Sequence, residues 1–263
     1  MKDETTSMKL KPISRRTLIG IAGSSLIVAA CSDNAATGRR QFVLISDAEL
    51  AALGQEAWRD ALQRLPRVDD AAMQRRLSRI GQKIAEVSPT ATDHDWEFVV
   101  FDAPEINAFV LPGGKVGFFR GLIDEARSDD EIAAVMGHEI GHVEARHAAE
   151  RMSQQAALEL GVSIAAAALS EEYGRNAETI AGALGAGALY GVILPYSRMQ
   201  ELEADRLGVR LMTSAGYDPS GALLFWRRMA SDGAGALEWM STHPADARRL
   251  AELEALVGQR ETQ

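Results

Sequence analysis

Residues 129–147 read DDEIAAVMGHEIGHVEARH. Helix formers and an apolar face over residues 131–135 predict an α-helix through this stretch, which we expect to run over 129–152. His138 and His142 are four residues apart. At about 100° per residue, their imidazoles project from the same helix face, one turn apart. Both side chains can therefore reach one metal ion.

Glu139 follows the first of these histidines and is offset around the helix. Its carboxylate can accept a proton from a water on the metal instead of binding the metal itself. We therefore predict that Glu139 is a catalytic general base. The pattern His-Glu-x-x-His also occurs in unrelated proteins. The alternative is a surface helix with two solvated histidines.

A zinc site of this kind needs a third protein ligand, often a carboxylate, and leaves the fourth position to water and substrate. Residues 197–205 read SRMQELEAD, which places Glu201 and Asp205 one turn apart on one helix face. We assign Glu201 as the third ligand and Asp205 as an acceptor for a ligand histidine N–H. One Zn²⁺ per chain is the expected cofactor, and a solvated acidic face is the alternative.

The remaining patterns predict an α+β fold that is mainly helical, with a small β-sheet ahead of the main helices. Strand-like segments at 108–111 and 116–119 flank a tight turn over 112–115, and a third covers 96–101. A capping box at 46–49 begins one expected helix. Helices are expected over 47–65, 70–87, 129–152, 153–170, 176–193, 197–215, 219–231 and 244–257.

The N-terminus reads as a targeting segment. Residues 1–30 have a net charge of +3 and end in an apolar stretch too short to span a bilayer. Residues 14–19 resemble a twin-arginine signal, and 28–31 resemble a lipobox in which Cys31 is lipidated. We expect a signal peptide over 1–30, a lipidated flexible tether over 31–39 and one domain over 40–263. The alternative is a cleaved secretory peptide with a chance cysteine.

Composition narrows the function further. Residues 31–263 have a net charge of −12 with no basic stripe, which argues against a nucleic-acid partner. Cys31 is the only cysteine, so the domain has no disulfide and relies on its core and its metal. The apolar segment 180–194 is interrupted by glycines. We expect a buried or lid-like helix there, with a re-entrant membrane helix as the alternative.

Together these motifs resemble a known family, the gluzincin metallopeptidases of the HtpX and CAAX-prenyl-protease type, and in particular their soluble periplasmic BepA- and LoiP-type members. The resemblance covers residues 37–256. Its matching pieces are TGRRQ (37–41), NAF (107–109), PGG (112–114), HEIGH (138–142) running on to Arg146-His147, SR (197–198), ELEAD (201–205) and STHP (241–244). We expect the protein to differ from BepA in having no C-terminal helical-repeat domain, and from HtpX in having no flanking transmembrane helices.

The resemblance implies zinc bound by His138, His142 and Glu201, with Glu139 catalytic and Asp205 in support. It also singles out His243, which in BepA-like members can occupy the fourth zinc position and hold the enzyme latent. His243 could instead stabilise the transition state, or simply precede Pro244 at a helix start. His147 lies about 140° around the helix from His142 and is expected to be a structural partner.

The resemblance further implies an edge strand beside the active-site helix, along which an extended substrate adds as another strand. Its expected substrate-binding residues are Asn107, Ala108, Phe109, Gly113 and Gly114.

The expected protein is thus a zinc-dependent metalloendopeptidase in which Glu139 acts on a zinc-bound water. We place it in the bacterial cell envelope, lipid-anchored through Cys31, facing the periplasm and on the outer membrane, because Ser32 follows the cysteine. Misfolded or unfolded envelope proteins are the expected substrates. The alternatives are a chaperone-like or assembly-supporting lipoprotein with a structural or latched zinc site, and an intramembrane protease that uses segment 180–194.

Overall fold

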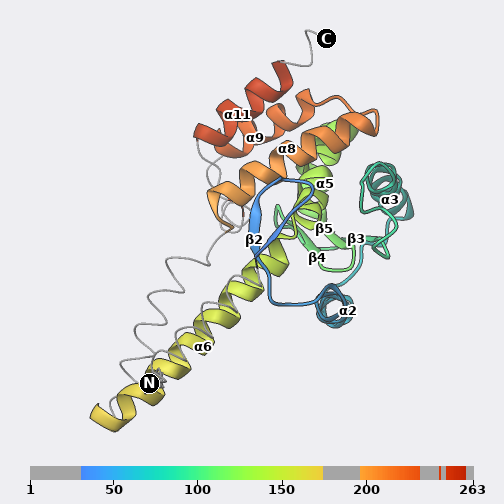
Figure 1. The fold of residues 1–263 in the computed structure, drawn as a ribbon. Helices are drawn as coiled ribbons and strands as arrows, with labels where there is room; N and C mark the ends of the chain where they lie inside the picture. The colour runs from blue at the N-terminus through green and yellow to red at the C-terminus, as the bar shows by residue number, and fades with distance from the viewer. Residues whose placement is uncertain (1–30, 174–195, 232–242, 244–246, 259–263) are drawn as a thin grey trace, which may run out of the picture.

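A computed structural model describes residues 31–173, 196–231, 243 and 247–258 (Figure 1). Within these residues the fold is mainly helical with small sheets, which confirms the predicted α+β class. The helices are α2 (Asp47–Arg64), α3 (Ala71–Glu86), α4 (Arg120–Glu125), α5 (Asp129–Glu144), α6 (His147–Tyr173), α8 (Arg198–Ser214), α9 (Ser220–Ser231) and α11 (Ala247–Gly258). The strands are β1 (Cys31–Asp33), β2 (Arg40–Phe42), β3 (Glu97–Phe101), β4 (Ala108–Leu111) and β5 (Lys115–Phe119).

The main sheet has the strand order β3-β5-β4, with β4 at one edge. β4 and β5 form the predicted antiparallel hairpin, and β3 pairs with β5 in parallel. Gly113 and Gly114 lie in the hairpin turn with φ of 86° and 85°, a backbone conformation that favours glycine. The resemblance suggests these two glycines as substrate-binding residues, and the turn gives each of them a structural requirement.

Helix α5 lies at the centre of the molecule and contacts α3, β4, α8 and α9 (Figure 1). Its apolar residues Ile132, Val135, Met136 and Ile140 are fully buried in the core. The polar residues His138, Glu139 and His142 on the same helix are also buried, so α5 is not a surface helix.

Helix α8 crosses α5 at close range because the contact is made by glycines. A Cβ on Gly137 would lie 2.7 Å from the carbonyl oxygen of Gly208, and a Cβ on Gly208 would lie 2.8 Å from the backbone nitrogen of His138. A Cβ on Gly141 would lie 2.8 Å from the carbonyl oxygen of Ala204. This close approach brings the polar residues of the two helices together.

The expected helix over 129–152 is wrong at its C-terminal half. Helix α5 ends at Glu144, and α6 begins at His147 and continues past residue 153, where the sequence predicts a new helix. Arg146 has a φ of 54°, in the left-handed region, so the chain turns sharply there. Nothing in the local composition marks this break, because Arg146 is neither glycine nor asparagine.

The expected flexible tether over 31–39 also differs from the structure. Strand β1 begins at Cys31 and pairs antiparallel with β2, and a turn over residues 34–38 connects them. Asn34 closes the turn because its Oδ1 accepts hydrogen bonds from the backbone N–H groups of Ala36 and Thr37. Small polar residues therefore mark a tight turn here, and not an unstructured linker.

The long helix α6 extends outward from the body (Figure 1). No described helix combines the length and apolar character needed to cross a membrane. Segment 180–194 and the expected signal peptide lie outside the described residues, as does most of the STHP motif apart from His243.

Candidate metal centre

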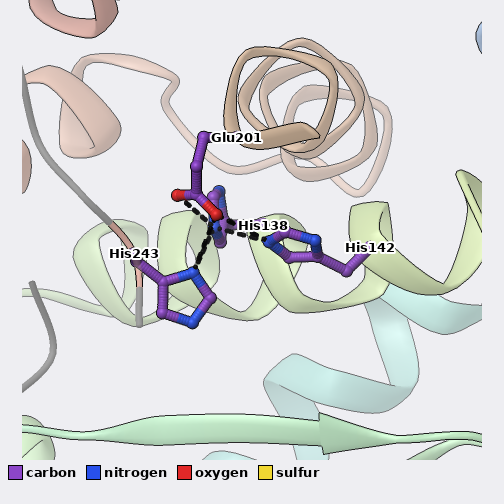
Figure 2. Close-up of side chains that lie close together, drawn as sticks. All are labelled: His138, His142, Glu201 and His243. Atoms are coloured by element: carbon purple, nitrogen blue, oxygen red, sulfur yellow. Dashed lines mark hydrogen bonds and ion pairs between the residues drawn. The ribbon is translucent and has the colours of Figure 1, made fainter. Parts of the chain in front are cut away.

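Four side chains converge beside α5 (Figure 2). His138 and His142 come from α5, Glu201 from the first turn of α8, and His243 from the chain ahead of α11. All four are buried, and one ligand atom from each lies within 4.8 Å of the others. The sequence predicts three of these residues as ligands and His243 as a fourth that could join them.

The geometry of the cluster fits a cation. The Nε2 atoms of His138 and His142 lie 3.0 Å apart. Glu201 places one carboxylate oxygen 3.5 Å from Nε2 of His138 and the other 3.4 Å from Nε2 of His142. Two imidazole rings and a carboxylate that meet in a buried space favour a cation between them. Two histidines and a glutamate form a donor set that zinc accepts in catalytic sites.

The first turn of α8 places Glu201. Ser197 caps the helix and forms a capping box with Gln200, which fixes where the helix begins. Burial opposes ionisation of Glu201, but the surrounding imidazoles and the Arg249 guanidinium outweigh it and hold its pKa well below the ordinary value. Glu201 is therefore a carboxylate, the form that binds a metal.

Asp205 supports His138 from the next turn of α8. Its Oδ1 lies 2.8 Å from Nδ1 of His138, the contact that the i, i+4 spacing of Glu201 and Asp205 suggests. Burial opposes ionisation of Asp205, but the ion pair with Arg249 and the bond to His138 lower its pKa to about 2. Asp205 therefore accepts the Nδ1–H of His138, and the unprotonated Nε2 of His138 faces the centre of the cluster.

Arg249 is a central residue that sequence reasoning missed. Its Nε and Nη2 each donate to Asp205 at 2.8 Å, and its Nη1 lies 2.6 Å from Glu201. Arg249 is only 3% exposed. An arginine in a charged helix, more than forty residues after Glu201, gives no sequence signal of this contact.

His142 is supported differently. Its Nδ1 lies 2.8 Å from Nδ1 of His147, whose Nε2 lies 3.0 Å from Oε2 of Glu203. His147 is thus the structural partner that the sequence suggests. The angle of about 140° between His142 and His147 assumes one continuous helix, and the turn at Arg146 brings the two rings together.

Glu139 is buried beside the cluster, and burial raises the pKa of its carboxyl group. Its Oε1 lies 3.7 Å from Nε2 of His243 and accepts no hydrogen bond from any described residue. The backbone N–H of Val110 on the edge strand also faces this carboxylate. A buried carboxylate oxygen without a donor is suited to accept a proton from a bound water.

Among the described strands, only β5 pairs with β4, so one side of β4 has no strand partner there. Phe119 donates its N–H to the carbonyl of Asn107 at 2.9 Å, so alternation along the ladder pairs Phe109 with Gly117. The backbone groups of Ala108 and Val110 then point away from β5. The ring of Phe109 packs against Trp58 and other aromatic rings. Of the expected substrate-binding residues, Ala108 is the one whose backbone lies on the free side, and Val110 was missed.

A cavity of about 600 Å³ adjoins the metal centre. Among its lining residues are Val110 of the edge strand, His142 of the cluster, Leu50 of α2 and Ala149 of α6. Tyr196, which sequence reasoning did not single out, also lines it, and its ring lies 4.2 Å from that of His142 between centroids. The space beside the edge strand is therefore continuous with the metal ligands.

Comparison with known proteins gives a consistent picture. The model of Peptidase family M48 matches residues 71–257. The mitochondrial metalloendopeptidase OMA1 of Schizosaccharomyces pombe is 40% identical over 182 residues, which cover 68% of this chain and 51% of that protein. OMA1 of Bos taurus is 32% identical over 84% of this chain and 43% of its own. The beta-barrel assembly-enhancing protease of Escherichia coli is 31% identical over 71% of this chain and 39% of its own. The chain spans about half the length of these relatives, or less.

Proposed function

Because the chain belongs to peptidase family M48, we propose that it is a zinc-dependent endopeptidase in which Glu139 is the general base. The observation that carries this proposal is the convergence of His138, His142 and Glu201 next to the buried carboxylate of Glu139. The relatives bear the names of metalloendopeptidases and of a protease, which supports the same activity.

His138, His142 and Glu201 would hold the zinc ion. A bound zinc ion would polarise the scissile carbonyl and acidify the attacking water. Asp205 fixes the tautomer of His138 by accepting its Nδ1–H, and His147 does the same for His142. Each ligand ring is therefore held with its Nε2 toward the centre before substrate arrives.

Glu139 takes a proton from the attacking water as the water oxygen bonds to the carbonyl carbon. Burial raises the pKa of Glu139, which makes its carboxylate a stronger base for this proton. Glu139 then donates that proton to the leaving amine as the peptide bond breaks. The base and the acid are one group, so the proton is returned within each turnover.

The substrate would lie as an additional strand on the free side of β4. The backbone groups of Ala108 and the carbonyl of Val110 can form hydrogen bonds with an extended chain and place its scissile carbonyl beside α5. Recognition through backbone groups depends little on side chains, which suits unfolded or misfolded proteins as substrates.

We also propose a location in the bacterial envelope, with Cys31 lipidated and the domain facing the periplasm at the outer membrane. The lipobox-like residues 28–31 support the anchor. The name of the Escherichia coli relative, a beta-barrel assembly-enhancing protease, supports envelope proteins as clients. Other relatives are named as mitochondrial, so the name of a relative alone does not assign a location.

One observation favours a second function, that of an assembly-supporting scaffold with a closed zinc site. Nδ1 of His243 lies 3.2 Å from Nε2 of His138 and 3.2 Å from Oε1 of Glu201. His243 is thus placed to act as a fourth protein ligand, the arrangement of structural zinc sites. The same geometry suits a latch on an enzyme that opens to admit substrate.

Casein cleavage by the purified full chain and by His243→Ala separates these functions. Zinc content is measured on each protein, and a chelator followed by added zinc tests the metal requirement. Zinc-dependent cleavage by either protein supports the peptidase. Faster cleavage by His243→Ala identifies a latch, and slower cleavage with zinc retained identifies a catalytic role for His243. Bound zinc without cleavage by either protein would overturn the peptidase and favour the scaffold.

A further inference from the structure

The N-terminal segment, residues 31–42, wraps around the end of the active-site helix. The side-chain amide of Asn34 donates to the carbonyl oxygen of Glu144 at 3.1 Å. The side-chain amide of Gln41 donates to the carbonyl oxygen of Ala145 at 2.6 Å. Both carbonyls lie at the C-terminus of α5, where helical partners run out. The segment therefore stabilises the turn between α5 and α6.

Arg39 is the charged centre of this contact. Its two Nη atoms donate to the two carboxylate oxygens of Glu150 at 2.7 Å each, and its Nε donates to Oε1 of Glu203 at 2.7 Å. Glu203 and Glu150 are 8% and 4% exposed. Two nearly buried carboxylates from α8 and α6 thus share one guanidinium supplied by the N-terminal segment.

A series of hydrogen bonds connects Arg39 to His142 through Glu203 and His147. Once His142 is taken as a metal ligand, the donor and acceptor in each bond are fixed. His142 faces the centre with Nε2, so its Nδ1 carries the proton and donates to Nδ1 of His147. The Nε2–H of His147 then donates to Oε2 of Glu203. Arg39 donates to the same carboxylate. Each group therefore orients the next one.

We propose that Arg39 is a positioning residue for His142, acting through Glu203 and His147. The inference rests on the proposed function in that it takes His142 as a zinc ligand. His138 has its own support in Asp205, so loss of Arg39 affects one ligand and spares the other. The seating of the N-terminal segment then determines how tightly the site holds zinc.

Zinc affinity of the full chain, measured by competition with a chelator, tests the inference without any proteolytic assay. Arg39→Gln is compared with Arg40→Gln, which removes the same charge from the neighbouring exposed residue. We expect Arg39→Gln to weaken zinc binding by about 10-fold or more, as loss of a supporting contact typically does. Arg40→Gln should change zinc affinity less than about 2-fold, because surface substitutions away from such contacts have small effects.

Two further variants guard against a general loss of folding. Glu203→Gln keeps the side-chain shape and should also weaken zinc binding by about 10-fold. In a His147→Gln background, Arg39→Gln should have little additional effect, because the connection to His142 is already cut. The absorption spectrum of the cobalt-loaded protein should change in Arg39→Gln and Glu203→Gln alike, since the ring of His142 is reoriented in both.

Wild-type zinc affinity in both Arg39→Gln and Glu203→Gln would overturn the inference. Equal losses from Arg39→Gln with and without His147 would do the same, because they would indicate a general structural effect. Failure of the proposed function has a different signature. In that case the wild-type chain binds no zinc, or binds zinc without cleaving casein, whatever residue stands at position 39.

Discussion

His138 and His142 of α5 are both expected to bind the metal, but their Nδ1 atoms have different hydrogen-bond partners. Nδ1 of His138 contacts the carboxylate of Asp205 directly, whereas Nδ1 of His142 reaches Glu203 only through a second imidazole. The first support was predictable, because Glu201 and Asp205 share a helix face by their spacing. The second was not, because it depends on the left-handed turn at Arg146 that no residue type announces.

Asp205→Asn should therefore lower zinc affinity by about 10- to 100-fold. An asparagine side chain can donate as well as accept a hydrogen bond, so it would no longer select the His138 tautomer whose Nε2 faces the metal. The substitution also removes the carboxylate that pairs with Arg249. Chelator competition measures the change, with the exposed Asp60→Asn as control. Unchanged zinc affinity in Asp205→Asn would contradict the role assigned to this carboxylate.

At the scale of helices and strands, periodicity and caps predicted most elements. Helix α3 was expected over 70–87 and spans Ala71–Glu86, and the β4–β5 hairpin has the expected turn. The close crossing of α5 and α8 was not expected. A glycine within a helix lowers helix propensity, but it does not indicate which other helix packs against it. The need for glycine at positions 137 and 208 is evident only in the folded protein, where a Cβ at either position would clash with the other helix.

Gly208→Ala tests that crossing. The new methyl group would lie 2.8 Å from the backbone nitrogen of His138, so the helices must separate. We expect unfolding free energy to fall by about 1–3 kcal/mol, the usual cost of overpacking. Gly161→Ala is the matched control, because its new methyl group would have no neighbouring atom within 4 Å and should stabilise α6 by up to about 1 kcal/mol. Equal stabilities of the two variants, measured by urea unfolding, would refute the close crossing.

The start of α5 is fixed by an ion pair with α9. The guanidinium of Arg228 donates to both oxygens of Glu131, at 2.6 Å and 3.0 Å. Burial opposes ionisation of Glu131, but the bonds from Arg228 and from the backbone N–H of Arg127 lower its pKa below the ordinary 4.5.

A lowered pKa in the folded protein means that ionised Glu131 stabilises the fold above pH 4.5. That stabilisation is lost as the pH falls through the lowered pKa. Glu131→Gln should therefore reduce unfolding free energy by about 1–3 kcal/mol at neutral pH, and the difference from wild type should shrink below pH 4.5. Urea unfolding between neutral and acidic pH measures this, with the exposed Glu105→Gln as control. If the difference in unfolding free energy between wild type and Glu131→Gln grew as the pH fell, the pKa of Glu131 would not be lowered in the folded protein.

At the scale of the whole molecule, the sequence predicted which side chains of α5 and α8 come together, but it did not predict what distant segments add to them. His138, His142 and Glu201 lie together, as the two helical motifs predict, and Glu139 is buried on the same helix. Arg249 and Tyr196 join the site from distant segments, and only the folded chain brings them there. Residues 31–39 were expected to form a flexible tether, yet the N-terminal segment contacts the end of α5 through Asn34 and Gln41.

A lipid at Cys31 would then hold the active site near the membrane surface. Asn34 is the third residue after Cys31, and an extended chain of that length spans about 10 Å. In a bacterial host, the wild-type chain should be found with membranes and should incorporate a labelled fatty acid. Cys31→Ser should do neither, with Ser32→Ala as control. A wild-type chain that carries no label would contradict the lipid anchor.

We propose that Glu139 performs the chemistry beside a zinc ion held by His138, His142 and Glu201. Zinc content and casein cleavage, measured together for Glu139→Gln and its parent in both the wild-type and His243→Ala backgrounds, test it most directly. We predict about one zinc per chain in every protein, and cleavage at least about 100-fold slower whenever Glu139 is replaced. A zinc-loaded Glu139→Gln chain that cleaves casein as fast as its parent would show that Glu139 is not the general base.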